Sequence, residues 1–278
     1  MRPGTFECIT ADSVEEVLSA LADGDTAVLA GGQSLAPEST PRVVDINRVP
    51  GLDLLAEQDG VLRVGPLVRH RVFESNAVGG PMGDLMRLVV CHIGHPPVRA
   101  RGTMLGSLAY AHPAAEWPVV AVMLGARFVL AGPRGSRTVP AEAFFTGAFT
   151  TLRRPDELLV EVCFPALRAG TGVGYAEDRR TTVFPQAAAM ATVTATGGVV
   201  EAASIGLVNA APCPVRARAA ERVLLGRPLS DSTIAEATAV IEVAAFRTLV
   251  RRALSQARTR MRSGAQVGLQ DERGGAGR

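Results

Sequence analysis

The stretch from His92 to Pro118 combines residue types that suit a ligand site better than a core. It is rich in Gly, Thr and Ser and carries three of the four histidines of the chain. Glycine leaves backbone N–H groups uncovered and tolerates positive φ, so the backbone near Gly102, Gly106 and Ser107 could hold an anion such as a phosphate. An ordinary Gly-rich connection between strands is the competing interpretation of this spacing.

A second loop favours the phosphate interpretation. Ala30–Leu35, reading AGGQSL, directly follows the apolar run Thr26–Leu29, which predicts a strand. Paired glycines and a hydroxyl at the end of a strand allow a backbone turn to wrap a diphosphate. Gln33 and Ser34 stand where a dinucleotide fingerprint needs its later glycines, and the chain lacks a Walker-type phosphate loop. The two loops therefore indicate a nucleotide held by some other scaffold.

The other reactive residues follow no metal or nucleophile motif. The four cysteines are widely separated without a C-x-x-C pair, which argues against an iron–sulfur cluster or a structural zinc in this chain. We expect a small buried side chain at each of them, at Cys8, Cys91, Cys163 and Cys213. His92 and His95 could bind a metal, but a plain Gly/Pro loop is the favoured interpretation.

Composition predicts a folded protein of about two domains. A chain of 278 residues can bury a sizeable core, and 47% hydrophobic against 20% charged residues is a globular balance. The net charge of +2 does not indicate a nucleic-acid partner. The N-terminus lacks the apolar region of a signal peptide, and no run approaches the roughly 18 to 20 apolar residues that span a membrane. We expect a cytoplasmic protein without a membrane or nucleic-acid partner.

Apolar periodicity predicts an α/β half followed by a smaller α+β domain. Helices are expected at 11–21, 71–91 with an interruption at 77–83, 114–124, 215–225 and 232–261. Strands are expected at 26–29, 43–46, 61–68, 127–130 and 157–164, and a hairpin at 187–195 and 199–208 around Thr196-Gly197-Gly198. The predicted organisation is a domain at 1–166 with lobes at about 1–50 and 51–166, a second domain at 167–262, and a disordered tail at 263–278.

Five blocks, taken in order, carry a family resemblance. They are AGGQSL, VVDINRVPGL (43–52), HIGHPPVRARGTMLGSLAYAHPAAEWP (92–118), AFFTGAFTTLRRPDELLVEVCFP (143–165) and VNAAPCPVRARAAERVLLGRPL (208–229). Together they resemble the FAD-binding medium subunit of molybdenum hydroxylases, a family that includes the medium subunits of carbon monoxide dehydrogenase and the flavin domain of xanthine dehydrogenase. The resemblance implies an α+β fold: a two-lobed FAD-binding domain of the PCMH/vanillyl-alcohol-oxidase type, then a smaller C-terminal domain with a three-stranded sheet and helices.

The resemblance also implies roles for individual residues. The loop that receives one part of the FAD diphosphate would be formed by Gly31, Gly32, Gln33, Ser34 and Leu35. The second loop, on the other side of the phosphates, would be formed by Thr103, Gly106 and Ser107. Glu116 would accept hydrogen bonds from the adenosine ribose hydroxyls. The backbone at Gly94 would approach the isoalloxazine ring, and Leu159 would pack on it.

Several positions depart from the family pattern. In the family's T-I-G-G-S block, Leu105 replaces the first glycine, which would weaken binding if the site needs positive φ or a close approach of phosphate there. Tyr110 and His112 stand in place of His and Asp in A-H-A-D-P, and either could act as an acid or a base. The segment 36–42 is shorter than the family's insert. The family's R-R-x-x-D-[FY] is Arg179–Phe184 here, without its Asp.

Three functions remain open on the sequence. The first and favoured one is an FAD-containing electron-transfer subunit, which would need an iron–sulfur subunit and a molybdenum-cofactor subunit as partners. The second is a stand-alone FAD-dependent dehydrogenase or tailoring enzyme that acts on a small organic molecule in specialised metabolism. The third, motivated by Leu105, is a non-redox protein on the same scaffold with FAD lost or kept as a structural ligand.

Overall fold

The N-terminal lobe is a small parallel sheet covered by one helix. The computed structural model describes residues 7–35, 41–179 and 184–274, with side chains as far as Met261. The elements of this lobe are β1 (Glu7–Thr10), α1 (Val14–Ala22), β2 (Thr26–Leu29) and β3 (Arg42–Asp45). The strand order is β1-β3-β2, with both pairs parallel. The helix begins after Ser13, whose hydroxyl accepts the N–H of Glu16 at 3.2 Å.

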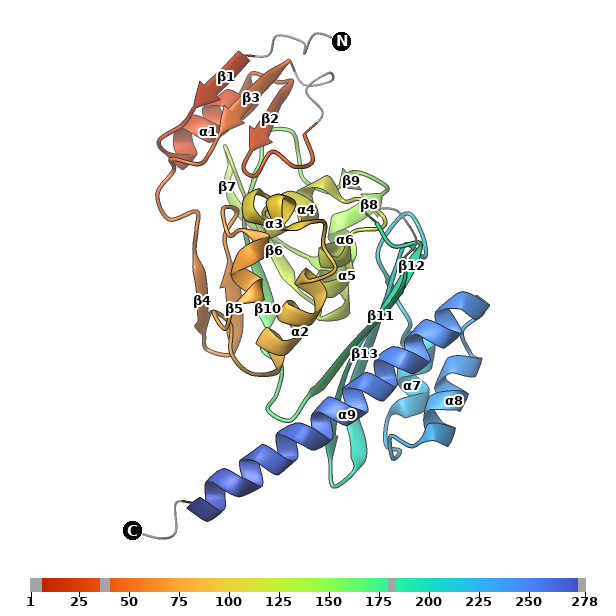
Figure 1. Ribbon diagram of the computed structural model, residues 1–278. Coiled ribbons are helices and arrows are strands. Elements are labelled where there is room, and N and C mark those ends of the chain that lie inside the picture. The colour runs from red at the N-terminus through yellow and green to blue at the C-terminus, as the bar shows by residue number, and fades with distance from the viewer. Residues whose placement is uncertain (1–6, 36–40, 180–183, 275–278) are drawn as a thin grey trace.

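The second lobe is a five-stranded antiparallel sheet packed against helices (Figure 1). Its strands are β4 (Leu55–Gln58), β5 (Val61–Val64), β6 (Arg127–Gly132), β7 (Gly135–Pro140) and β10 (Leu158–Pro165), in the order β4-β5-β10-β6-β7. Its helical elements are η2 (His70–Glu74), α2 (Gly80–Val90), α3 (Pro96–Arg101), α4 (Met104–Tyr110), α5 (Glu116–Met123) and α6 (Ala141–Phe144). A short pair, β8 (Phe145–Gly147) and β9 (Thr150–Thr151), follows.

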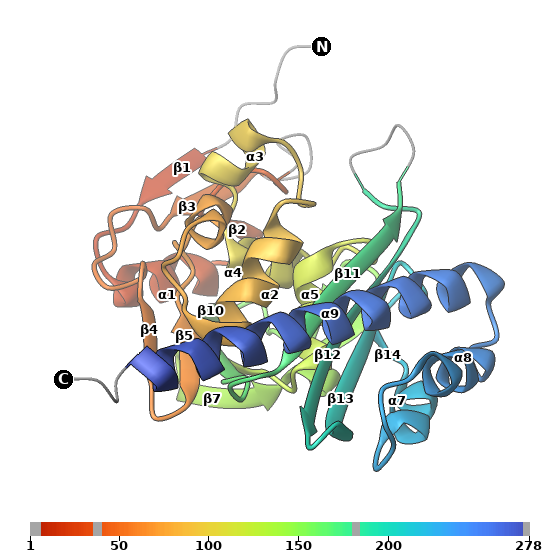
Figure 2. The ribbon, with the colours of Figure 1, turned by 60° about the horizontal axis from the view of Figure 1, so that its bottom comes forward.

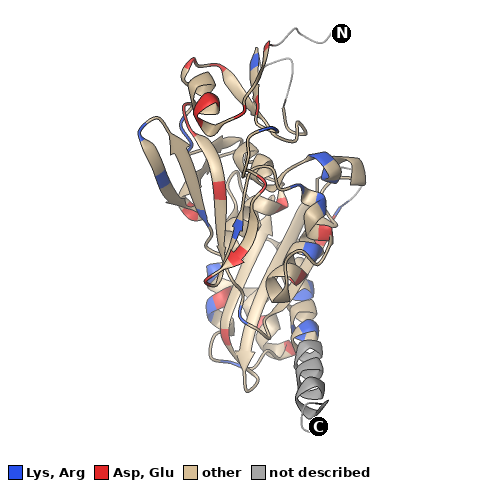
Figure 3. Cartoon of the chain, turned by 90° about the vertical axis from the view of Figure 1, so that its left-hand side faces the viewer, with Lys and Arg blue, Asp and Glu red and all other residues tan. Residues whose placement is uncertain are grey.

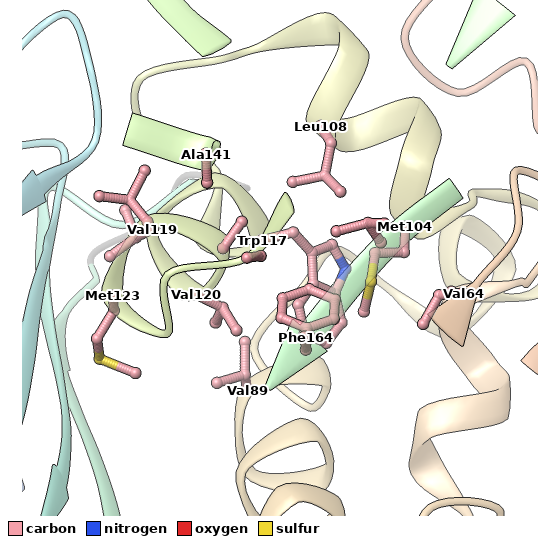
Figure 4. Packing of buried hydrophobic residues seen from close by; sticks show 14 of the residues in the cluster. Val64, Val89, Met104, Leu108, Trp117, Val119, Val120, Met123, Ala141 and Phe164 are labelled. Atoms are coloured by element: carbon pink, nitrogen blue, oxygen red, sulfur yellow. The ribbon is translucent and has the colours of Figure 1, made fainter. Parts of the chain in front are cut away.

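Helix α5 forms the centre of this lobe. Every residue from Glu116 to Met123 is buried, as expected for a helix that packs on all sides. Trp117 lies among Met104, Val89 and Val120 in the core (Figure 4). The far side of α5 packs on the C-terminal sheet, where a Cβ at Gly206 would lie 2.5 Å from Val119. The first turn of α5 therefore lies where the two domains meet.

The C-terminal domain is an antiparallel sheet with helices on one face. Its elements are β11 (Gly172–Asp178), β12 (Ala187–Thr196), β13 (Val199–Val208), β14 (Val215–Arg216), α7 (Arg218–Leu224), α8 (Asp231–Ala239) and α9 (Ala244–Gly274). Helix α9 crosses the sheet (Figure 2), and it approaches β11 so closely that a Cβ at Gly174 would lie 1.9 Å from the carbonyl oxygen of Ala253. The predicted hairpin is confirmed, with positive φ at Gly197 and Gly198.

Some expected elements differ in extent. The sheet has the three long strands of the resemblance plus the two-residue β14, which occupies the expected start of a helix at 215. The helix expected at 232–261 is divided into α8 and α9, and α9 continues past Ser263, the expected start of the tail. The expectation of four buried cysteines is wrong for Cys8 and Cys91, which are exposed; all four are free thiols.

Positions of positive and of negative residues alternate along the elements in the view of Figure 3, in keeping with the small net charge. In the part of the chain that the structure describes, no helix is both long enough and apolar enough to cross a membrane.

Candidate functional site

The two glycine loops of the sequence meet at a cavity of about 460 Å³ between the N-terminal lobe and the second lobe. This volume lies within the range of about 300 to 1,000 Å³ that is typical of small-molecule sites. Ten of the predicted site residues line the cavity. They are Gly31, Gly32, Gln33, Ser34, Leu35, Gly94, Thr103, Gly106, Ser107 and Leu159. Residues far apart in the sequence are thus brought to one site, as expected for both loops.

The first loop needs glycine at both of its glycine positions. A Cβ at Gly31 would lie 2.4 Å from the carbonyl oxygen of Arg101 and 2.8 Å from the Cα of Gly102, so only glycine lets the two loops touch. Gly32 has a φ of +70°, which side chains rarely adopt. The loop therefore turns sharply at the cavity with its backbone uncovered.

The second loop is held by a threonine cap. The Thr103 hydroxyl accepts the N–H of Gly106 at 3.0 Å, and Thr103 is itself buried. Leu105, the departure from the family pattern, lies within α4 with a negative φ, and its side chain is 2% exposed in the core. The leucine takes part in the cavity wall, yet the cavity remains open. The backbone at Leu105 therefore does not adopt positive φ in this structure.

Arg69 joins the two loops, a role that the sequence did not indicate. Its guanidinium donates to the carbonyl oxygen of Arg101 at 2.6 Å, to that of Ala30 at 3.3 Å, and to the side chain of Asn47. The Asn47 amide in turn donates to the carbonyl oxygen of Ala30 at 2.9 Å. One cation thus fixes the spacing of both loops and adds positive charge behind them.

The third predicted element of the wall is the turn at Gly94. Its φ of +51° favours glycine, and a Cβ there would lie 2.9 Å from the Val98 side chain. Arg99 donates to the carbonyl oxygens of Ile93 and Gly94, at 3.1 Å each. Leu159 lies on β10 beside a register shift in its pairing with β6, and it contributes an apolar wall.

Glu116 does not line the cavity. It is 3% exposed at the start of α5, and its carboxylate lies 3.3 Å from the Arg179 guanidinium. Burial raises the pKa of Glu116 to about 8, despite the charge of Arg179. Arg179 also binds Glu177, at 2.9 Å, and the carbonyl oxygen of His92, at 2.8 Å. Glu116 therefore takes part in a network of charged groups between the domains, and its ribose role stays a prediction.

The sequence did not indicate that an aromatic group forms part of the cavity wall, although Tyr110, His112 and Phe184 were noted in the departures from the family pattern. Tyr110, His112 and Phe184 line the cavity. The His112 and Phe184 rings stack with centroids 3.9 Å apart at 9°, and Phe149 meets His112 edge-on at 5.1 Å. Phe149 has a φ of +57°, and its N–H donates to the carbonyl oxygen of Ala111. The neighbouring positions 180–183 of the family motif lie outside the described residues.

The lining fits FAD. Glycine backbone too close for any Cβ, together with hydroxyl side chains, lines the cavity where the two loops touch, and this arrangement suits a diphosphate. Apolar and aromatic side chains, including Leu159 and Phe184, form other parts of the wall and suit a planar ring system.

Comparison with known proteins supports this fit. The family model of the FAD binding domain in molybdopterin dehydrogenase matches residues 4–167, and that of the CO dehydrogenase flavoprotein C-terminal domain matches 177–257. The alpha subunit of the 6-hydroxypseudooxynicotine dehydrogenase complex of Paenarthrobacter nicotinovorans is 34% identical over 94% of this chain and 97% of its own length. The beta subunit of caffeine dehydrogenase from Pseudomonas sp. (strain CBB1) is 35% identical over 85% of this chain and 83% of its own.

Solved structures agree with the sequence comparisons. A chain of carbon monoxide dehydrogenase from Hydrogenophaga pseudoflava, in a form that lacks the Mo-pyranopterin moiety of the molybdenum cofactor, superposes with a TM-score of 0.85 at 33% identity, over 94% of this chain and 99% of that one. The chain therefore belongs to the FAD-binding medium subunits of the molybdenum hydroxylase family, and it is an FAD-dependent oxidoreductase of this flavoprotein type.

Proposed function

We propose that this chain is the electron-transferring subunit of a molybdenum hydroxylase and works in a complex with an iron–sulfur subunit and a molybdenum-cofactor subunit. The observation that carries the proposal is the cavity where the two glycine loops meet, on a chain whose relatives are subunits of dehydrogenases. Among the described residues, no group of three or more His, Cys, Asp or Glu side chains is placed to hold a metal ion. We infer that the metal centres lie on the partners.

Within this complex, the residues of this chain bind and orient the cofactor. Bound FAD supplies the redox chemistry, and the protein supplies position and electrostatics. Gly31–Leu35 and Thr103–Ser107 would hold the diphosphate from two sides, with Arg69 behind them. Gly94 and Leu159 would contact the isoalloxazine ring, and the stacked His112 and Phe184 would cover the aromatic end and exclude water.

The choice of substrate would belong to the molybdenum subunit. The relatives are named for substrates as unlike as caffeine, 6-hydroxypseudooxynicotine and carbon monoxide, while they share this flavoprotein fold. An electron-transfer subunit has no need to contact any of these molecules. We also propose that the complex lies in the cytoplasm.

Purification of the tagged full chain from the cells that make it tests the proposal. We expect two further polypeptides to co-purify, with molybdenum and iron in the complex and with neither metal in the chain after it is separated. The complex should bleach its flavin absorption when it is given its substrate without oxygen, whereas the separated chain should not. A separated, metal-free chain that turns over a small organic substrate by itself would contradict the proposal and establish the stand-alone dehydrogenase.

A further inference from the structure

His70 lies buried at the junction of the two glycine loops. It is 5% exposed, and its backbone N–H donates to the carbonyl oxygen of Gly102 at 2.9 Å. Its ring lies against the same glycine, since a Cβ at Gly102 would fall 2.8 Å from the ring Cδ2 and 2.9 Å from Nε2. His70 is also part of the cavity wall. Its ring edge therefore meets the cavity where the loops approach each other.

Trp117 fixes the tautomer of this histidine. The indole Nε1–H of Trp117 donates to His70 Nδ1 at 3.0 Å. An indole N–H can only donate, so Nδ1 must accept, and the ring proton of neutral His70 must lie on Nε2. Trp117 is fully buried in the core (Figure 4), so this orientation is rigid.

The histidine remains neutral at ordinary pH. Burial, together with the positive charges of Arg99 and Arg69, lowers the pKa of His70 to about 4. A second proton is therefore absent near pH 7. The side chain is a neutral donor with a single N–H.

The Nε2–H of His70 has no hydrogen-bond partner among the described residues. Every fully buried side-chain nitrogen and oxygen in that part of the chain has a partner. The Nε2 atom is therefore reached from the cavity and not sealed in the core. A nearly buried N–H donor without a protein partner needs an acceptor in the cavity to offset its lost hydrogen bonds to water.

The geometry points to His70 as a binding residue whose Nε2–H donates a hydrogen bond to the diphosphate of the cofactor between the two loops. This inference rests on the proposed function, because it takes the diphosphate of FAD as the occupant of that end of the cavity. A fixed neutral donor contributes directional recognition of phosphate oxygen, whereas Arg69 supplies the charge behind the loops.

Two matched variants test this role. A Gln side chain places its amide about where Nε2 lies, and an Asn side chain places its amide about where Nδ1 lies. His70→Gln thus keeps a donor toward the cavity, whereas His70→Asn keeps only the partner of Trp117. We expect His70→Asn to weaken binding of FAD and of ADP by about ten- to a hundredfold, and His70→Gln to stay within a few-fold of the wild type.

Riboflavin, which has no phosphate, separates a phosphate contact from a general structural effect. Its affinity should be unchanged in His70→Asn, measured by fluorescence titration of the full chain. Equal losses for ADP and riboflavin, or no loss for either, would overturn the inference. A wild-type chain that binds neither FAD nor ADP would overturn the proposed function, and this inference with it.

The tautomer of His70 in the wild-type chain offers a second test. With ¹⁵N-labelled histidine, the His70 signals, which report on Nε2 and Nδ1, can be identified by their absence in His70→Gln. Between pH 6 and 8 we expect the neutral tautomer protonated on Nε2, and a shift of Nε2 on addition of ADP. A charged ring, a proton on Nδ1, or an Nε2 signal that ADP does not shift would overturn the inference.

Discussion

At Glu116, burial raises the pKa of the carboxyl group more than the nearby Arg179 lowers it. The carboxyl group is 3% exposed, and burial raises its pKa from 4.5 to about 8 although Arg179 lies 3.3 Å away. A carboxyl group with a higher pKa in the folded than in the unfolded chain binds extra protons in the folded state. Its contribution to stability is therefore complete below about pH 4.5 and is lost as the pH rises toward about 8.

The fall in stability with rising pH gives a prediction for Glu116→Gln. The free energy of unfolding of the wild type, taken relative to that of the variant, should fall as the pH rises from about 4.5 to about 8. Urea unfolding at half-unit steps of pH measures the difference. Glu57→Gln, which changes an exposed carboxylate on β4, should show no such trend. A difference that does not vary with pH would mean that Glu116 is ionised throughout this range.

Gly31 gives a second prediction at the scale of single residues. Gly31→Ala would place a Cβ 2.4 Å from the carbonyl oxygen of Arg101, which must force the two loops apart. We expect a loss of about 1–3 kcal/mol of stability and a fall of more than about tenfold in FAD affinity. The control is Gly79→Ala, since a Cβ there meets nothing within 4 Å. Equal FAD affinity in both variants would show that the loop contact does not shape the site.

At the scale of elements, the site depends on how the loop after β2 is held against the loop between α3 and α4. Arg69 holds both through the carbonyl oxygens of Ala30 and Arg101. Arg69→Met would remove this donor from both groups, and Ala30 would keep the amide of Asn47, at a cost of about 1–3 kcal/mol. FAD affinity measured by titration should fall by about tenfold or more. Arg71→Met removes the same charge from an exposed position in η2, so equal losses in both variants would favour a general electrostatic effect.

The sequence predicts the loops well but not what joins them. Paired glycines after an apolar strand are a local signal, because only glycine adopts positive φ readily and lacks a Cβ, so the residue type itself indicates the turn. The bond from Arg69 to Ala30 joins positions 39 residues apart, and nothing in the spacing marks it. For the same reason the environment of His70 was missed: its partner Trp117 is 47 positions away.

At the scale of the whole molecule, an ion-pair network joins the FAD-binding domain to the C-terminal domain. Arg179, just after β11, binds Glu177 on that strand and reaches Glu116 and the carbonyl oxygen of His92 in the other domain. His92 also stacks on Tyr175, with ring centroids 4.2 Å apart. The network therefore fixes the position of the sheet against the lobe that carries the cavity.

Arg179→Met should weaken the coupling between the unfolding of the two domains. The Glu177 carboxylate and the Glu116 carboxyl group would lose their shared partner, and we expect a loss of about 3 kcal/mol in the free energy of unfolding and a broader thermal transition. Differential scanning calorimetry measures both. Arg168→Met removes an exposed pair with Glu201 and should lower the free energy of unfolding much less. Similar effects of the two substitutions would argue that the network does not couple the domains.

More of the overall architecture than of this network could be predicted from the sequence. Strand alternation and the Gly197-Gly198 turn identify the C-terminal hairpin, and the five family blocks identify both domains. The ribose role of Glu116 stays a prediction from the motif, whereas its contact with Arg179 of the other domain joins positions 63 residues apart and has no local signal. Burial and long-range pairing depend on how domains pack, which local pattern does not contain.

The central claim is that the cavity between the two lobes holds FAD. The most direct measurement is the visible absorption spectrum of the purified full chain, followed by denaturation and identification of the released flavin. We predict a flavin spectrum and about one non-covalent FAD per chain, with neither in Gly32→Trp, whose side chain would fill the first loop. A colourless wild-type chain that added FAD cannot reconstitute would contradict the account.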